Sequence, residues 1–132
     1  MKLLALTIVV VLSLASMSTL AQDANELKVT FGKTKRFDGG KLKIKFLDVI
    51  EDSRCPEGVN CIWAGTARIK IAIIENDNSC EYEIETNGSH QSIEYDGFVV
   101  ELRSLEPNRK ENDATVKEQY IATISIKPRS KG

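Results

Sequence analysis

The residues of this sequence that could bind a metal or form covalent bonds are, first of all, three cysteines and one histidine. Cys55, Cys61, Cys80 and His90 would together supply the ligand set of a Cys3His zinc centre. Structural zinc sites usually bring their ligands in two arms of closely spaced pairs, such as Cys-x-x-Cys, and no such arm is present. The spacing therefore predicts neither a metal site nor any other bound cofactor.

A disulfide between Cys55 and Cys61 is the pairing that the spacing favours. The two cysteines are close in sequence, and Pro56 and Gly58 between them let the chain turn back. Such a bond requires an oxidising compartment. Closing so short a ring stabilises a fold by about 2 kcal/mol on chain-entropy grounds. The two pairings that involve Cys80 stay open.

Acidic side chains crowd the same segment, and carboxylate oxygens are ligands that suit calcium. The four residues concerned are Asp48, Glu51, Asp52 and Glu57. Their spacing is not that of an EF-hand loop. Ion pairs with a nearby arginine, either Arg54 or Arg68, are the simpler expectation.

No arrangement in the sequence is typical of a catalytic site. There is no Gly-x-Ser-x-Gly elbow, no phosphate-binding glycine loop and no His-Glu-x-x-His motif. Glu81, Glu83 and Glu85 alternate along one segment, which places them on one wet face of a strand. Such a row protects an exposed strand more often than it forms the paired carboxylates of a glycosidase. We therefore do not expect an enzyme.

The loop that this disulfide would close, residues 51–65, is called the stapled loop below. It would present four side chains suited to recognition. These candidate binding residues are Arg54, Glu57, Ile62 and Trp63. Tryptophan and arginine are frequent interface hot spots, and a disulfide lowers the ordering cost of binding. The competing interpretation is structural: Trp63 closes the open end of the fold, and Arg54 pairs with Asp52. Because large aromatic side chains usually fill cores first, the structural role of Trp63 is favoured here.

The segment from Asp52 to Gly65 resembles a family of small, largely uncharacterised exported bacterial proteins. The resemblance rests on Asp-Ser-Arg-Cys-Pro at 52–56, on Cys61, and on Trp-Ala-Gly at 63–65. It is weaker over the rest of the chain, where it covers the strand spacing and the stretch 95–107. The resemblance implies export and a β fold, and it transfers no catalytic residue.

The N-terminus has the pattern of a secretory signal peptide. Lys2 is followed by an almost unbroken apolar run from Leu3 to Leu14, and small residues stand at Thr19 and Ala21. The run is shorter than the roughly 20 residues that a membrane span needs. The sequence therefore predicts a signal peptide at 1–21 and a single mature domain at 22–132, located in the periplasm or outside the cell.

The charge balance gives no general reason to bind polyanions. The chain has 18 Lys and Arg against 19 Asp and Glu, and loss of Lys2 changes this to 17 against 19. No long block of one sign is present, whereas nucleic-acid affinity depends on clustered cations. We expect no nucleic-acid partner, no membrane contact after cleavage, and a monomer.

Apolar and polar residues alternate with period two through most of the mature chain, as in strands with one buried face. Turn residues separate these runs, which predicts an all-β fold, a single antiparallel β-sandwich of about six or seven strands. The core-facing residues would be Val29, Phe31, Leu42, Ile44, Phe46, Ile69, Ile71, Ile73, Tyr82, Ile84, Phe98, Val100, Leu102, Ile124 and Ile126.

Three finer expectations follow from this alternation. A hairpin centred on Asp77-Asn78 would place Lys70 opposite Glu85 and Ile71 opposite Ile84. Cys80, which shares parity with Tyr82 and Ile84, would point into the core. The polar stretch 107–114 is expected to be an exposed, mobile loop, and its sequence implies no function.

The sequence thus favours an exported, non-catalytic binding module, an inhibitor being one form of it, whose stapled loop contacts another exported or envelope protein. A structural or accessory domain of the cell envelope is the main alternative. A carbohydrate-binding module is a more distant one, because only Trp63 and three tyrosines could stack on a sugar.

Overall fold

The computed structural model describes residues 26–37, 40–110 and 115–129. The signal peptide predicted at 1–21 lies outside the described residues. Within them the chain forms eight strands and a single turn of 3-10 helix, η2 (Lys117–Gln119). The strands are β1 (Glu26–Thr30), β2 (Thr34–Phe37), β3 (Leu42–Asp52), β4 (Ala67–Glu75), β5 (Asn78–Glu85), β6 (Ser92–Tyr95), β7 (Phe98–Glu106) and β8 (Ile121–Pro128).

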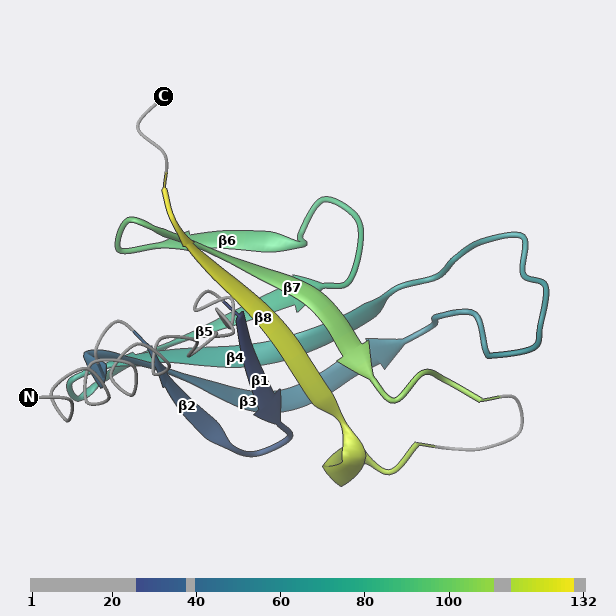
Figure 1. Ribbon diagram of the computed structural model, residues 1–132, viewed down its shortest axis with the longest axis horizontal. Helices are drawn as coiled ribbons and strands as arrows, with labels where there is room; N and C mark the ends of the chain where they lie inside the picture. Colours follow the sequence, from purple (N-terminus) through teal and green to yellow (C-terminus); the bar gives the residue numbers. More distant parts are fainter. Residues whose placement is uncertain (1–25, 38–39, 111–114, 130–132) are drawn as a thin grey trace, which may run out of the picture.

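The strands form two four-stranded antiparallel sheets, one ordered β1-β8-β7-β6 and the other β2-β3-β4-β5. Figure 1 shows the first sheet lying across the second, with β8 and β7 in front of β3 and β4. The chain changes sheet between β1 and β2 and again between β5 and β6. The predicted all-β sandwich is confirmed, with eight strands instead of six or seven.

The core lies between the sheets and takes side chains from both. All fifteen apolar residues that the alternation assigned to the core face it. Most are fully buried, while Phe31, Tyr82 and Phe98 are half-buried and pack against the core. Period-two alternation predicted these faces correctly because one side of each strand meets the opposing sheet.

Two bulges in β3 decide which side chains enter the core beyond Phe46. The pairing with β4 shifts between Phe46 and Asp48 and again between Val49 and Glu51. Strict alternation from Phe46 would turn Asp48 inward. The first bulge instead places Val49 inside, opposite Ile69, and leaves Asp48 outside. The second bulge returns Asp52 to the inner side, opposite Ala67, at the end of the sandwich.

The predicted register of the β4–β5 hairpin is wrong by two residues. Lys70 lies opposite Glu83, and Ile71 lies opposite Tyr82. The reason is the turn: Asn76, with φ of 53°, starts a two-residue turn with Asp77, so Glu75 pairs directly with Asn78. A shift of two residues keeps every side chain on its predicted face, so the burial pattern was still correct.

Cys80 is exposed, which contradicts the expectation that it is buried. It lies on the predicted face of the strand, since it is directly opposite the buried Ile73. However, β5 is the edge strand of its sheet, and burial fades along it from Ile84, which is fully buried, through the half-buried Tyr82 to Cys80. The alternation along an edge strand therefore gives the face of a side chain but not its burial.

Candidate functional site

The loop between β3 and β4 begins as a continuation of their pairing. The backbone N–H of Ser53 donates to the carbonyl of Thr66 (2.8 Å), and that of Cys55 donates to the carbonyl of Ala64 (3.0 Å). Gly65 has φ of +69°, and a Cβ atom there would overlap the backbone of Ser53. Only glycine lets the two arms of the loop approach this closely.

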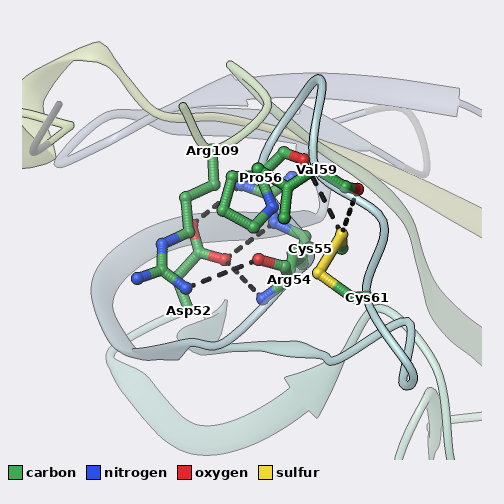
Figure 2. Close-up of a disulfide and its surroundings, with 7 residues drawn as sticks. All are labelled: Asp52, Arg54, Cys55, Pro56, Val59, Cys61 and Arg109. Atoms are coloured by element: carbon green, nitrogen blue, oxygen red, sulfur yellow. Dashed lines mark hydrogen bonds and ion pairs between the residues drawn. A yellow bond between two sulfur atoms is a disulfide. The ribbon is translucent and has the colours of Figure 1, made fainter. Parts of the chain in front are cut away.

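A disulfide joins Cys55 to Cys61 above this paired base, with their Cα atoms 5.9 Å apart. The predicted pairing is therefore confirmed, and Cys80 is the free cysteine. Within the ring, the Val59 carbonyl oxygen lies 3.0 Å from Sγ of Cys55. Figure 2 shows the disulfide with Asp52, Arg54 and Arg109 close to it. The bond is consistent with an oxidising, exported location.

Asp52, Arg54 and Tyr120 form a clasp that joins the two sheets below the loop. Nε and Nη2 of Arg54 donate to the two carboxylate oxygens of Asp52 at 2.8 and 2.9 Å. The same guanidinium donates to two backbone carbonyls, that of Leu105 in β7 and that of Pro107 just after it. The ion pair that the sequence suggested between Arg54 and Asp52 is confirmed, and it is a bidentate pair.

Tyr120, immediately before β8, completes the clasp from the other sheet. Its hydroxyl donates to Oδ2 of Asp52 at 2.7 Å. Burial raises the pKa of Asp52, but the hydrogen bonds from Arg54 and Tyr120 outweigh it, so the net pKa lies below the ordinary value of 3.8. Burial, and then the bond to Asp52, raise the pKa of Tyr120 above 10.0. Asp52 is therefore a carboxylate, and Tyr120 a neutral donor, at neutral pH.

The stretch after β7, which was expected to be an exposed, mobile loop, is hydrogen-bonded to the stapled loop. The backbone N–H of Glu57 donates to the carbonyl of Arg109 (2.9 Å), and Nδ2 of Asn108 donates to Oε1 of Glu57 (3.0 Å). Glu57 also forms a parallel β-bridge with Lys110. Residues 111–114 of the predicted loop lie outside the described residues. Figure 1 shows both connections at the same end of the sandwich.

Trp63 does not close the end of the sandwich, so the favoured structural interpretation is wrong. Its side chain is 80% exposed, and the neighbouring Ile62 is 91% exposed. The clasp occupies the position that Trp63 was expected to fill: Tyr120 is 5% exposed, and the Asp52 and Arg54 side chains are largely buried. The ring and the paired base of the loop leave these two apolar side chains in solvent.

The four predicted binding residues thus divide into two groups. Ile62 and Trp63 project from the loop, whereas Arg54 is held in the clasp and Glu57 is tied to Asn108. Sequence reasoning missed the role of Tyr120. A signal was present, because a tyrosine with core parity needs a partner for its hydroxyl when it is buried.

Three of the four acidic residues of this region, Asp48, Glu51 and Asp52, pair with cations, and the fourth, Glu57, accepts from the amide of Asn108. Asp48 pairs with Lys117 at 2.8 Å, and Glu51 pairs with Arg68 at 3.2 Å. Within the described residues no group of three or more His, Cys, Asp or Glu is placed to hold a metal ion. The sulfurs of Cys55 and Cys61 are bonded to each other, so they are not thiolate ligands.

The searches for known relatives found no match to this chain among protein-family models, curated proteins or solved structures. No helix in the described part of the chain has the length and apolar character needed to cross a membrane. The functional argument therefore rests on the stapled loop and on the surface around it.

Proposed function

We propose that this protein is an exported, non-catalytic binding module that docks onto another protein through Ile62 and Trp63. The observation that carries the proposal is the exposure of these two adjacent side chains, 91% and 80%, on a loop closed by a disulfide. A large apolar side chain releases about 1.5–3 kcal/mol when it is fully buried. An interface that covers both residues would therefore gain several kcal/mol from this dipeptide.

The anchoring of the loop supports recognition in a preformed shape. The loop is held at its base by the Ser53–Thr66 pairing, at its centre by the disulfide, and on one side by Asn87, whose Nδ2 donates to the Gly65 carbonyl at 2.7 Å. Binding to a loop that is already ordered avoids much of the entropic cost of association. Arg54 contributes to recognition by anchoring the loop through the clasp, and Glu57 belongs to the rim of the proposed docking surface.

Export is part of the same proposal. Cleavage after Ala21 would release a mature domain from Gln22 to Gly132, soluble in the periplasm or outside the cell and monomeric. The signal-like pattern of residues 1–21 and the Cys55–Cys61 bond support it, as does the resemblance of the segment 52–65 to exported bacterial proteins. N-terminal sequencing of the secreted protein tests the cleavage site, and Gln22 is the expected first residue.

A structural or accessory role in the cell envelope is the second candidate. The clasp and the loop together close one end of the sandwich, which a purely architectural element would also do. This role leaves the exposure of Ile62 and Trp63 without a purpose. A carbohydrate-binding role that depends on stacking against Trp63 is a third candidate, and soluble glycans would then raise the melting temperature by ligand linkage.

The deciding experiment is affinity capture from the native envelope and medium, followed by measurement of the Kd with the purified partner. The variant is Ile62→Ala with Trp63→Ala. The matched control is Ile50→Ala with Val116→Ala, because these residues are also exposed apolar side chains, at 42% and 55%. We expect the control to keep the partner and the loop variant to lose it by at least a hundredfold in Kd.

Two other outcomes would contradict the proposal. Equal capture by the wild-type protein and the loop variant would place the interface elsewhere. If no bait captures a partner while all three remain folded, the architectural role is the better account of the loop.

A further inference from the structure

The outer surface of β2 and β3 carries a compact group of cations. Arg36 lies directly opposite Lys43, and Thr34 lies opposite Lys45. Residues directly opposite one another on antiparallel strands point to the same face of the sheet. Because Leu42, Ile44 and Phe46 face the core, Lys43, Lys45 and Arg36 all point away from it. We refer to Arg36, Lys43 and Lys45 as the cationic face.

These three cations have no acidic partner in the part of the chain that the structure describes. No carboxylate oxygen there lies within 4.0 Å of their charged nitrogens, whereas ten ion pairs are formed elsewhere. Like charges placed directly opposite each other, as in the pair Arg36 and Lys43, destabilise a sheet. The cationic face thus lowers the stability of the sheet, and no ion pair among the described residues offsets this loss.

The other half of the same sheet surface is built differently. Between β4 and β5, Lys70 lies opposite Glu83 and Arg68 lies opposite Glu85. Arg68 pairs with Glu85 at 3.1 Å, and Lys70 approaches Glu81 at 4.0 Å. Opposite charges thus face each other across β4 and β5, whereas like charges face each other across β2 and β3. The excess of positive charge is therefore local to β2 and β3.

Protection of a sheet edge does not account for the cationic face. Charged side chains on an edge strand prevent pairing with other chains, and this explains Arg36, because β2 is an edge strand. Lys43 and Lys45 are on β3, which lies between β2 and β4 inside the sheet. Their charges protect no edge.

We propose that the cationic face binds a linear anionic polysaccharide through charge, independently of the stapled loop. Residues two apart on one strand are about 6.8 Å apart, and directly opposite Cβ atoms are about 5 Å apart. A flat grid of cations with this spacing fits an extended chain that carries a carboxylate or sulfate at regular intervals. Thr34, beside Lys45, adds a hydroxyl for the sugar.

Two other polyanions fit this surface less well. Single-stranded nucleic acid is held by aromatic rings on which bases stack, and the cationic face consists of Arg36, Lys43 and Lys45 with Thr34, Ala72 and Ile74 as their other opposite residues. Peripheral membrane binding needs apolar side chains that insert as well as charge. In the described residues the exposed large apolar side chains are Ile50, Ile62, Trp63 and Val116. Only Ile50 lies on β3, five residues beyond Lys45, and none of the four lies among the three cations.

The test measures the Kd of the purified, disulfide-bonded protein for polygalacturonate and for dextran sulfate, with neutral dextran as the reference. The variant is Arg36→Gln with Lys43→Gln and Lys45→Gln. The matched control is Lys28→Gln with Lys35→Gln and Lys127→Gln, three exposed cations whose loss changes the net charge equally. Single-stranded DNA and phosphatidylglycerol vesicles are measured in parallel.

We expect binding to at least one anionic polysaccharide and none to neutral dextran, with affinity falling about tenfold or more between about 50 mM and 200 mM salt. The cationic-face variant should lose at least tenfold in Kd and the control less than twofold. The variant should unfold at the same temperature as the wild-type protein or higher, because a repulsion is removed. If it fails to fold, Lys43→Gln and Lys45→Gln are tested singly, and each should lose affinity measurably.

Three results would overturn the inference. These are an equal loss in the variant and the control, tighter binding to DNA or to the vesicles than to either anionic polysaccharide, and no binding to the polysaccharides at low salt. Trp63→Ala should leave this affinity unchanged, which separates it from the docking proposed for the stapled loop.

Discussion

The hydroxyl of Tyr120 lies 2.7 Å from Oδ2 of Asp52, and this contact connects the two sheets at the end where the stapled loop emerges. Asp52 is the last residue of β3, and Tyr120 immediately precedes β8. Arg54 donates to both oxygens of this carboxylate and extends the connection to Leu105, near the end of β7. The loop that presents Ile62 and Trp63 is therefore anchored in a polar group that is itself fixed on both sheets.

Replacing Arg54 should destabilise the protein strongly. Arg54→Ala leaves the Asp52 carboxylate, 10% exposed, without its cation, and we expect a loss of about 3–5 kcal/mol in the free energy of unfolding. Arg54→Lys keeps the charge but not the planar fork, so it should recover only part of the loss. Urea denaturation measures both. The control is Arg103→Lys, at a half-exposed ion pair, which should change stability by less than about 0.5 kcal/mol. Similar losses at both sites would contradict the structural role of the clasp.

The clasp should also give the protein a specific acid dependence. The pKa of Asp52 is lower in the folded protein than its ordinary value of 3.8. The carboxylate therefore contributes stability that is complete above pH 3.8 and is lost as the pH falls through the lower, folded value. We expect Asp52→Asn to be less stable than the wild-type protein at pH 7, and the difference to shrink below pH 3.8. Thermal unfolding across this range measures it, and a difference that stays constant down to pH 2.5 would contradict it.

Gly65 should be the glycine of the loop that tolerates substitution least. Gly65→Ala adds a Cβ atom that would overlap the Ser53 carbonyl, at a residue with φ of +69°. Gly58 has a similar φ of +78° but nothing within 4 Å of such an atom, so Gly58→Ala isolates the backbone strain of about 1–2 kcal/mol. We expect Gly65→Ala to cost at least about 2 kcal/mol more than Gly58→Ala in the free energy of unfolding. Equal costs would mean that the two arms of the loop do not approach as closely as described.

Cys80 should react with a maleimide in the native protein under non-reducing conditions. It is exposed and free, whereas Cys55 and Cys61 are joined, and access is a main determinant of thiol labelling. Mass spectrometry should find one label per chain, added at a rate close to that in urea. Cys80→Ser should remove the labelling. A thiol that reacts only after unfolding would restore the buried position that alternation suggested.

The sequence predicted the features that depend on neighbours along the chain. Alternation identified the buried face of Leu42, Ile44 and Phe46, and short spacing identified the Cys55–Cys61 bond. The sequence-based prediction failed where the burial of a residue depends on how the two sheets meet. Cys80 is exposed although it lies opposite the buried Ile73, because it lies near the end of an edge strand, and the alternation of side chains does not indicate which strand is at the edge.

Trp63 shows the same limit at the loop. Whether a tryptophan beside the end of a sandwich is buried depends on what else fills that end, and here Asp52 and Arg54 are joined there by Tyr120, a residue 66 positions beyond Arg54. Nothing local to the segment 52–65 indicates this partner. The cationic face is equally non-local, because Arg36 and Lys43 become neighbours only when β2 pairs with β3.

The fluorescence of Trp63 offers a direct check of its exposure, because it is the only tryptophan in the chain. With its side chain 80% exposed, the native protein should emit at nearly the same wavelength as N-acetyltryptophanamide, and acrylamide should quench both to a similar extent. Unfolding in urea should change the emission maximum little, and Trp63→Phe gives the background from the tyrosines. Emission at shorter wavelength that resists quenching would mean that Trp63 is buried, and the docking proposal would lose the observation that carries it. Once a partner is in hand, a blue shift on complex formation would place Trp63 inside the interface.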